Sequence, residues 1–229
     1  MSEREQIVRE VRELMTQEWK ARFKEEQNMK LNQFRQQNRY IRKGETLFTG
    51  SSLMEMFPIT EFCLNEGYPI AYNRGIGGYT TDDFLAAVDV MLLEPQPKKL
   101  FINIGTNDIR EYPEGQDWFA HLSENYRKIC EIIRDQLPET IVYMMAYYPV
   151  NEDKLREISQ TPPFRTNEGV RKANQMVAAL AEEFGLRYID VNDGLKDVRG
   201  QLQAEHTRDG IHFDAAAYRT VFDRLKQYL

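Results

Sequence analysis

Two short segments, far apart in the sequence, carry side chains suited to nucleophilic catalysis. Ser51 and Ser52 follow an apolar segment and Gly50, where a strand should end and a helix begin, so a hydroxyl there would be exposed. Asp209 precedes His212 by three residues, and a carboxylate at that spacing can hold an imidazole in one tautomer and orientation. Together they favour acyl transfer, although the serines alone are equally typical of a helix N-cap.

Two more segments resemble ligand-binding turns. Residues 73–81 contain Gly75, Gly77 and Gly78, which let backbone approach a ligand closely. The segment nearly matches a dinucleotide-binding pattern, but Thr80 stands where the third glycine is required, so this match is weak. In the second segment, residues 104–108, an Asn-Asp pair is more typical of a turn or a cap than of a site.

The histidines also permit a weaker hypothesis, a metal site. The chain has three, at positions 121, 206 and 212. His206, Asp209 and His212 could bind zinc, but zinc would favour a third nitrogen or sulfur ligand, and neither cysteine is near in the sequence. We therefore expect no metal and no cofactor.

From residue 45 onward, short apolar segments alternate with amphipathic ones. Such an alternation predicts a parallel sheet covered on both faces, with the ligand site at the carboxyl ends of its strands. The predicted strands lie near residues 46–49, 70–73, 100–104, 141–146 and 188–191. The predicted helices span roughly residues 53–66, 81–93, 116–136, 167–184 and 215–228.

Residues 1–44 differ in composition and predict a separate helical extension. They hold eleven basic residues against seven acidic ones, whereas the net charge of the whole chain is −6. The basic stretch 27–44 could touch an anionic surface, but it is more typical of a solvated helix face or of an arm packed against the acidic body of its own or a partner subunit. We expect no nucleic-acid binding. An apolar stripe on this helix must bury against something, either the same chain or a second copy: Ile7, Val11, Leu14, Met15, Trp19 and Phe23.

Overall composition indicates a soluble globular protein. Hydrophobic residues make up 41% and charged residues 29% of the 229 residues. The longest uncharged apolar run, residues 141–150, is about half of the roughly 20 residues needed to cross a bilayer. The N-terminus opens on polar residues instead of an apolar signal segment. Cys63 and Cys130 fit free thiols, so we expect a cytoplasmic protein without membrane insertion.

Taken in order, the four segments resemble the sequence blocks of the GDSL or SGNH hydrolase superfamily. The resemblance covers residues 46–229 and is closest to the platelet-activating-factor acetylhydrolase-like esterases, on the segments NRGIGGYTT, IGTNDI, YYPVNE and DGIHF. It implies a flavodoxin-like three-layer α/β/α fold with the five-stranded parallel sheet. It divides the chain into an extension, residues 1–44, and a hydrolase domain, residues 45–229.

The resemblance also assigns roles to individual residues. Ser52 would be the nucleophile, and Asp209 and His212 would complete a catalytic triad. The backbone N–H of Gly78, the side-chain amide of Asn107 and the backbone N–H of Ser52 would form the oxyanion hole. Ser51 replaces the family's usual aspartate, so the choice between the two serines rests on position alone.

The substrate is the least determined property. Tyr79, Tyr147 and Tyr148 come after predicted strands, where aromatic rings could line a cleft, although Tyr147 and Tyr148 fit the core equally well. We expect a small-molecule ester with a short acyl group, acetyl first, on a sugar or other small alcohol. A lysophospholipase or thioesterase is the alternative enzyme, and a binding or assembly module without catalysis is the alternative outside enzymes.

Overall fold

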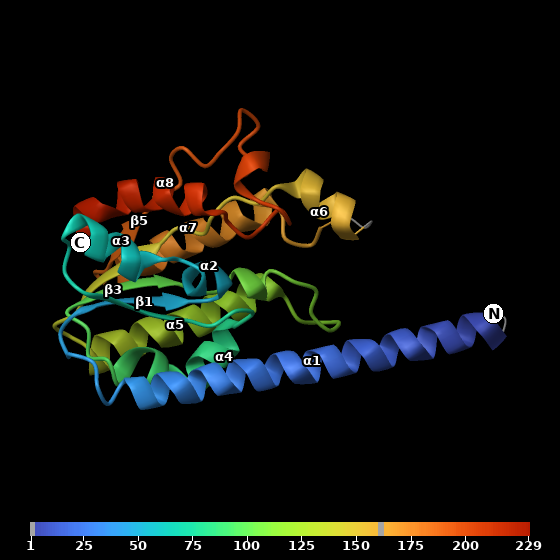
Figure 1. The fold of residues 1–229 in the computed structure, drawn as a ribbon, viewed down its shortest axis with the longest axis horizontal. Coiled ribbons are helices and arrows are strands. Elements are labelled where there is room, and N and C mark those ends of the chain that lie inside the picture. The colour runs from blue at the N-terminus through green and yellow to red at the C-terminus, as the bar shows by residue number, and fades with distance from the viewer. Residues whose placement is uncertain (1–2, 160–162) are drawn as a thin grey trace.

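The five predicted strands form one parallel sheet. The structure is a computed structural model that describes residues 3–159 and 163–229. The strands are β1 (Thr46–Gly50), β2 (Ala71–Gly75), β3 (Lys99–Asn103), β4 (Ile141–Met145) and β5 (Arg187–Ile189), in the order β2-β1-β3-β4-β5. The prediction of a five-stranded parallel sheet in a three-layer α/β fold is confirmed (Figure 1).

Helices cover both faces of the sheet. They are α1 (Glu3–Gln37), α2 (Ser52–Glu55), α3 (Ile59–Glu66), α4 (Thr81–Ala86), α5 (Trp118–Gln136), α6 (Glu152–Ser159), α7 (Asn167–Glu183) and α8 (Ala215–Leu225). One apolar cluster joins the sheet to α4, α5 and α7, and a second joins it to α2, α3 and α8. Successive side chains of each strand point to opposite faces of the sheet and so contribute to the two clusters in turn, as a sheet buried on both faces requires.

The helices differ from the sequence prediction at three places. The helix predicted over residues 53–66 is divided into α2 and α3 because Pro58, which lies between them, cannot continue a helix. The helix predicted over residues 81–93 changes after α4 into a π-helix, Asp89–Leu93. The sequence analysis did not predict α6, which is only eight residues long and buries none of them.

The register of the sheet brings three site-bearing turns to one edge. Gly50 at the end of β1 pairs with Gly75 of β2 on one side and with Asn103 of β3 on the other. The segments after these residues contain Ser52, Gly78 and Asn107. Gly50 itself has φ +154°, and a β-carbon there would lie 2.0 Å from the Asn103 carbonyl oxygen, so this turn admits only glycine.

Helix α1 runs along the side of the sheet that carries α4 and α5, and then continues beyond the rest of the molecule (Figure 1). Its C-terminal half contacts the π-helix Asp89–Leu93, and Lys30 and Arg35 of the basic stretch form ion pairs with Glu55 and Asp89. This stretch therefore packs against acidic side chains of its own chain, one of the two interpretations above.

The apolar stripe of α1 is not buried as the sequence analysis expected. Leu14, Met15 and Trp19 are 61%, 65% and 62% exposed, whereas Phe23 packs against Gly78. The side chains of Ile7 and Val11 lie outside the described part of the chain. Most of the described stripe thus projects past the domain surface that could have covered it.

Two further expectations concern cysteines and membranes. Cys63 and Cys130 are both buried free thiols, and burial raises the pKa of Cys63 to about 11 and of Cys130 to about 12.

Across residues 3–159 and 163–229, no helix combines the length and the apolar character needed for a membrane span.

Candidate active site

Ser52 is the first residue of α2 and directs its hydroxyl toward a histidine 160 residues away in the sequence. Its Oγ lies 2.9 Å from Nε2 of His212. Ser51, by contrast, is 2% exposed and is the N-cap residue of α2, with no side-chain hydrogen bond to the helix. The structure therefore brings Ser52 and not Ser51 to the imidazole.

The second nitrogen of the His212 ring contacts a carboxylate. Nδ1 lies 2.5 Å from Oδ2 of Asp209, whose Oδ1 accepts hydrogen bonds from the backbone N–H groups of Ile211 and His212. Burial alone would raise the pKa of Asp209, but the bonds from the His212 ring and from these N–H groups lower it to about 2. An ionised Asp209 accepts a hydrogen bond from Nδ1–H, which leaves Nε2 free to accept the Ser52 hydroxyl proton.

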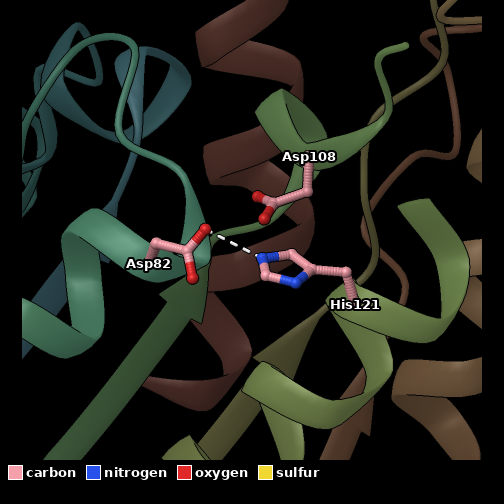
Figure 2. A group of neighbouring side chains, drawn as sticks. All are labelled: Asp82, Asp108 and His121. Carbon is pink, nitrogen blue, oxygen red and sulfur yellow. Dashed lines mark hydrogen bonds and ion pairs between the residues drawn. The ribbon is translucent and has the colours of Figure 1, made fainter. Parts of the chain in front are cut away.

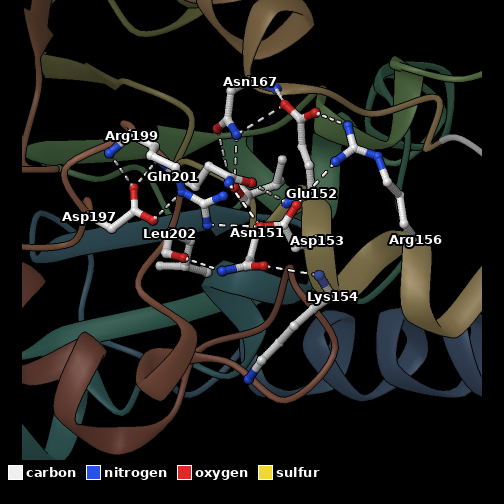
Figure 3. Close-up of polar contacts among 11 residues, drawn as sticks. Asn151, Glu152, Asp153, Lys154, Arg156, Asn167, Asp197, Arg199, Gln201 and Leu202 are labelled. Atoms are coloured by element: carbon white, nitrogen blue, oxygen red, sulfur yellow. Dashed lines mark hydrogen bonds and ion pairs between the residues drawn. The ribbon is translucent and has the colours of Figure 1, made fainter.

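The loop with Asp209 and His212 is held in place by the start of α6. The backbone N–H of Asn151 donates to the Gly210 carbonyl (2.8 Å), and its side-chain amide donates to the Leu202 carbonyl (2.7 Å). Lys154 donates to the carbonyls of Ala204 and Thr207. Figure 3 shows how Asn151 and Lys154 lie within a wider polar network that joins α6 to the segment around Gln201.

The glycine-rich segment lies beside Ser52, since a β-carbon on Gly77 would sit 3.8 Å from the Ser52 β-carbon, and it also contacts the Asn107 turn. Nδ2 of Asn107 donates to the Tyr79 carbonyl (2.9 Å), which links the two turns directly. Gly78 has φ +74°, so its turn is one that a residue with a side chain rarely adopts. An amide nitrogen carries two N–H groups, so Asn107 keeps a second donor besides the one that holds the turn.

Arg165 belongs to this site, and the sequence analysis missed it. Its Nη2 donates to Oδ1 of Asn107 (2.8 Å), which fixes which end of that amide faces Tyr79. Burial lowers the pKa of Arg165 to about 10, against the opposing effect of Asp108 and Asp209, so the guanidinium stays charged at neutral pH. No pattern in the sequence marks an arginine 58 residues away as a partner of Asn107.

The three tyrosines considered for the lining of a cleft have buried side chains. Burial contradicts the prediction for Tyr79, and for Tyr147 and Tyr148 it favours core packing, the alternative that the sequence left open. Tyr79, Tyr147 and Tyr148 are all 2% exposed or less. Tyr147 donates its hydroxyl to the Ile104 carbonyl (2.6 Å) and fills the space beside Gly105, so it supports the Asn107 turn from behind. Tyr148 packs edge-on against Phe213, which precedes α8. Aromatic residues after strands are thus used here as packing.

An open cleft of about 720 Å³ borders the histidine side of the site. Asp209 and His212 form part of its wall, together with Met56, Glu205, Arg208, Phe213 and Asp214. Both charged and apolar side chains line it, so a ligand there would meet hydrogen-bonding groups as well as hydrophobic surface.

The structure also brings together a group that could hold a metal ion, but at a different place from the one considered in the sequence. Asp82, Asp108 and His121 place one ligand atom each within 4.8 Å of one another (Figure 2). Hydrogen bonds already occupy these atoms, since His121 contacts Asp82 (2.8 Å) and Asp108 accepts from the backbone and hydroxyl of Thr81. The cluster therefore ties the start of α4 to the Asn107 turn. Within the described residues, His206, Asp209 and His212 form no such group.

Solved structures share this fold. A Streptococcus pneumonia protein provisionally described as a platelet activating factor is 29% identical, with a TM-score of 0.83 over 94% of this chain and 98% of that one. The acetylxylan esterase Axe2 from Geobacillus stearothermophilus is 18% identical, with a TM-score of 0.62 over 82% of this chain and 95% of that one. The second likeness shows the fold alone.

Sequence comparison identifies the family. The GDSL esterase/lipase WDL1 of Oryza sativa subsp. japonica is 25% identical over 166 residues, which span 68% of this chain and 64% of the rice protein's length. The sequence profile of the GDSL-like Lipase/Acylhydrolase family matches residues 60–220, well over half of the chain and including Gly78, Asn107, Asp209 and His212. The chain therefore belongs to the GDSL-like lipase/acylhydrolase family.

Proposed function

We propose that this protein is a serine esterase that removes a short acyl group, acetyl in the first place, from a sugar or other small alcohol. The observation that carries the proposal is the hydrogen-bonded chain from Ser52 through His212 to Asp209. Family membership supports the reaction class, and the linked turns that contain Gly78 and Asn107 support the assignment of the oxyanion hole.

The reaction begins with transfer of the Ser52 proton. Nε2 of His212 accepts this proton as Oγ bonds to the acyl carbon of the ester, which forms a tetrahedral intermediate. Asp209 remains ionised beside Nδ1–H and stabilises the imidazolium. The imidazolium then gives its proton to the departing alcohol oxygen, and an acyl-Ser52 ester remains.

The negative oxygen of the intermediate needs donors that are in place before the reaction. We assign this role to the backbone N–H of Ser52, the backbone N–H of Gly78 and the second side-chain N–H of Asn107. Water then repeats the sequence with His212 as the base, and the carboxylic acid leaves with Ser52 regenerated. Every step uses groups of this chain and water.

The cleft beside His212 favours a polar alcohol moiety. Charged side chains such as Glu205 and Arg208 can bond to hydroxyl groups, while Met56 and Phe213 can cover an apolar ring face. An acetylxylan esterase is among the proteins that share this fold, so the fold is compatible with such chemistry.

Chromogenic esters of increasing acyl length test the proposal. We expect turnover of p-nitrophenyl acetate to exceed that of the butyrate and the octanoate, and to fall by about 10⁴-fold or more in Ser52→Ala. Ser51→Ala is the matched control and should stay within a few-fold of the wild type. Rates that rise toward the octanoate would favour a lipid acylhydrolase, and turnover equal in the wild type and Ser52→Ala would leave a binding module.

A further inference from the structure

The peptide between Gly77 and Gly78 is held from outside the family core. Its carbonyl oxygen, that of Gly77, accepts a hydrogen bond from Nε2 of Gln27 in helix α1 (2.7 Å). The N–H of Gly77, which belongs to the preceding peptide, donates to the carboxylate of Glu55, and Glu55 also pairs with Lys30 of α1. Both groups of Gly77 are thus tied, directly or through one side chain, to a helix that precedes the residues matched by the family profile.

The direction of this carbonyl determines the direction of the neighbouring donor. In a planar trans peptide the C=O and the N–H point to opposite sides, so the bond to Gln27 turns the Gly78 N–H away from α1. Both residues of the peptide are glycines, for which the flipped orientation carries little steric cost. The orientation must therefore be set by a partner, and Gln27 is the partner of the Gly77 carbonyl.

Gln27 is well placed to hold the peptide firmly. Its side chain belongs to a residue only 5% exposed, so water competes little for the bond. One turn earlier on the same helix face, Phe23 lies so close to Gly78 that a β-carbon there would sit 2.5 Å from its ring. Lys24 pairs with Asp83 (2.6 Å), whose carboxylate caps the backbone of Thr80 just beyond the glycines. The helix therefore lies along the whole turn.

We infer that Gln27 is a positioning residue for ester hydrolysis, because it keeps the Gly78 N–H aimed at the oxyanion. The inference rests on the proposed function and extends it: α1 becomes part of the catalytic unit although it lies outside the GDSL family match. Gln27 touches no reacting atom and acts through one peptide plane.

The test replaces Gln27 by residues that cannot donate. Gln27→Glu keeps the shape but presents an ionised acceptor to the Gly77 carbonyl, and Gln27→Met removes the donor without adding charge. We expect kcat on p-nitrophenyl acetate to fall at least tenfold in both variants, while KM stays within about twofold of the wild type. The upper limit for the fall in kcat is the roughly 10²- to 10³-fold loss seen when an oxyanion donor is removed. Gln33→Glu, an exposed position on the same helix, is the control and should match the wild type.

Two readouts separate positioning from general destabilisation. In Gln27→Glu the loss should shrink toward acid pH, because a protonated carboxyl can donate to Gly77 again, whereas Gln27→Met should show no such recovery. Inhibition by a short alkylboronic acid, whose adduct with serine places an oxygen in the oxyanion hole, should weaken in parallel with kcat. Thermal melting of both variants is the control for folding, and we expect both to remain folded at the assay temperature.

The outcomes also separate this inference from the proposed function. Turnover in the wild type that depends on Ser52, together with wild-type kcat in Gln27→Glu and Gln27→Met, would overturn the role of Gln27 and leave the esterase intact. A lower kcat in both variants, with no recovery of Gln27→Glu at acid pH and with unaltered boronate inhibition, would show a structural role only. Absence of Ser52-dependent turnover in the wild type would remove the proposed function and this inference together.

Discussion

Replacing Arg165 by methionine should impair the reaction without touching the triad. The guanidinium donates to Oδ1 of Asn107 and so determines which end of that amide faces the Tyr79 carbonyl and, in the proposed mechanism, the oxyanion. Methionine retains much of the side-chain volume but cannot donate. The Asn107 amide then loses its charged partner and keeps only the bond to Tyr79.

The size of the effect can be worked out from that single bond. A hydrogen bond to a charged group contributes roughly 1.5 to 3 kcal/mol. If this free energy maintains the amide orientation, its loss lowers the productive population by about ten- to a hundredfold, since about 1.4 kcal/mol corresponds to a factor of ten. The upper limit is the loss expected for Asn107→Ala itself, about 10²- to 10³-fold in kcat.

A double-mutant cycle gives the decisive assay. We expect kcat on p-nitrophenyl acetate to fall about ten- to a hundredfold in Arg165→Met, and the double variant Arg165→Met/Asn107→Ala to be no slower than Asn107→Ala alone. Arg171→Met, which removes an exposed arginine paired with Glu168, is a suitable control. If the losses multiply in the double variant, Arg165 does not act through Asn107 and its assigned role is wrong.

Three further predictions concern the carboxylates and the exposed helix. Because the pKa of Asp209 is about 2, the group is ionised at all pH values above about 4, and Asp209→Asn should lower kcat at pH 7 by about 10⁴-fold, measured with the same ester. Burial raises the pKa of Asp108, so its ionisation costs stability as pH rises through that pKa. Melting curves from pH 4 to 7 should therefore show Asp108→Asn gaining stability relative to the wild type, and a constant difference would contradict this. We propose that the exposed Leu14 and Trp19 pair with a second copy of the chain, so sedimentation should show a smaller assembly for Leu14→Glu/Trp19→Glu, whereas an unchanged mass would refute the pairing.

The sheet and the nucleophile side of the site were predictable because local rules determine them. Apolar segments of strand length separated by amphipathic stretches indicate β1 to β5, and a parallel sheet brings the turns after its strands to one edge. Asp209 and His212 are close in sequence, so their contact requires only one turn. The contact between Ser52 and His212, which are 160 residues apart in the sequence, is then expected from the strand order. It is also expected because His212 is the histidine with an aspartate three residues before it.

The errors in the fold have equally physical causes. Pro58 divides a predicted helix, and its effect could have been anticipated from the missing N–H. An aromatic ring that follows a strand can point into a cleft or into the core. For the tyrosines here, only the packing around Gly105 and Phe213 decides between the two directions. The stripe on α1 was expected to be buried, but its helix is longer than the surface beneath it.

The supports of the proposed oxyanion hole could not be predicted, because each is one polar contact between distant residues. Gln27 and Gly77 are 50 residues apart, and Arg165 and Asn107 are 58 apart. A glutamine on a helix or an arginine in a loop is typical of a surface, so neither carries a signal in a single sequence. His212 is oriented by Asp209, three residues away in the sequence, although Asn151 and Lys154 also hold the loop that contains both. The proposed oxyanion donors at Gly78 and Asn107 lie in turns whose polar supports, Gln27 and Arg165, come only from distant parts of the chain. If Gly78 and Asn107 are the oxyanion donors that we propose, substitutions of Gln27 and Arg165 should lower kcat more than they change KM, since they disturb groups that act on the transition state.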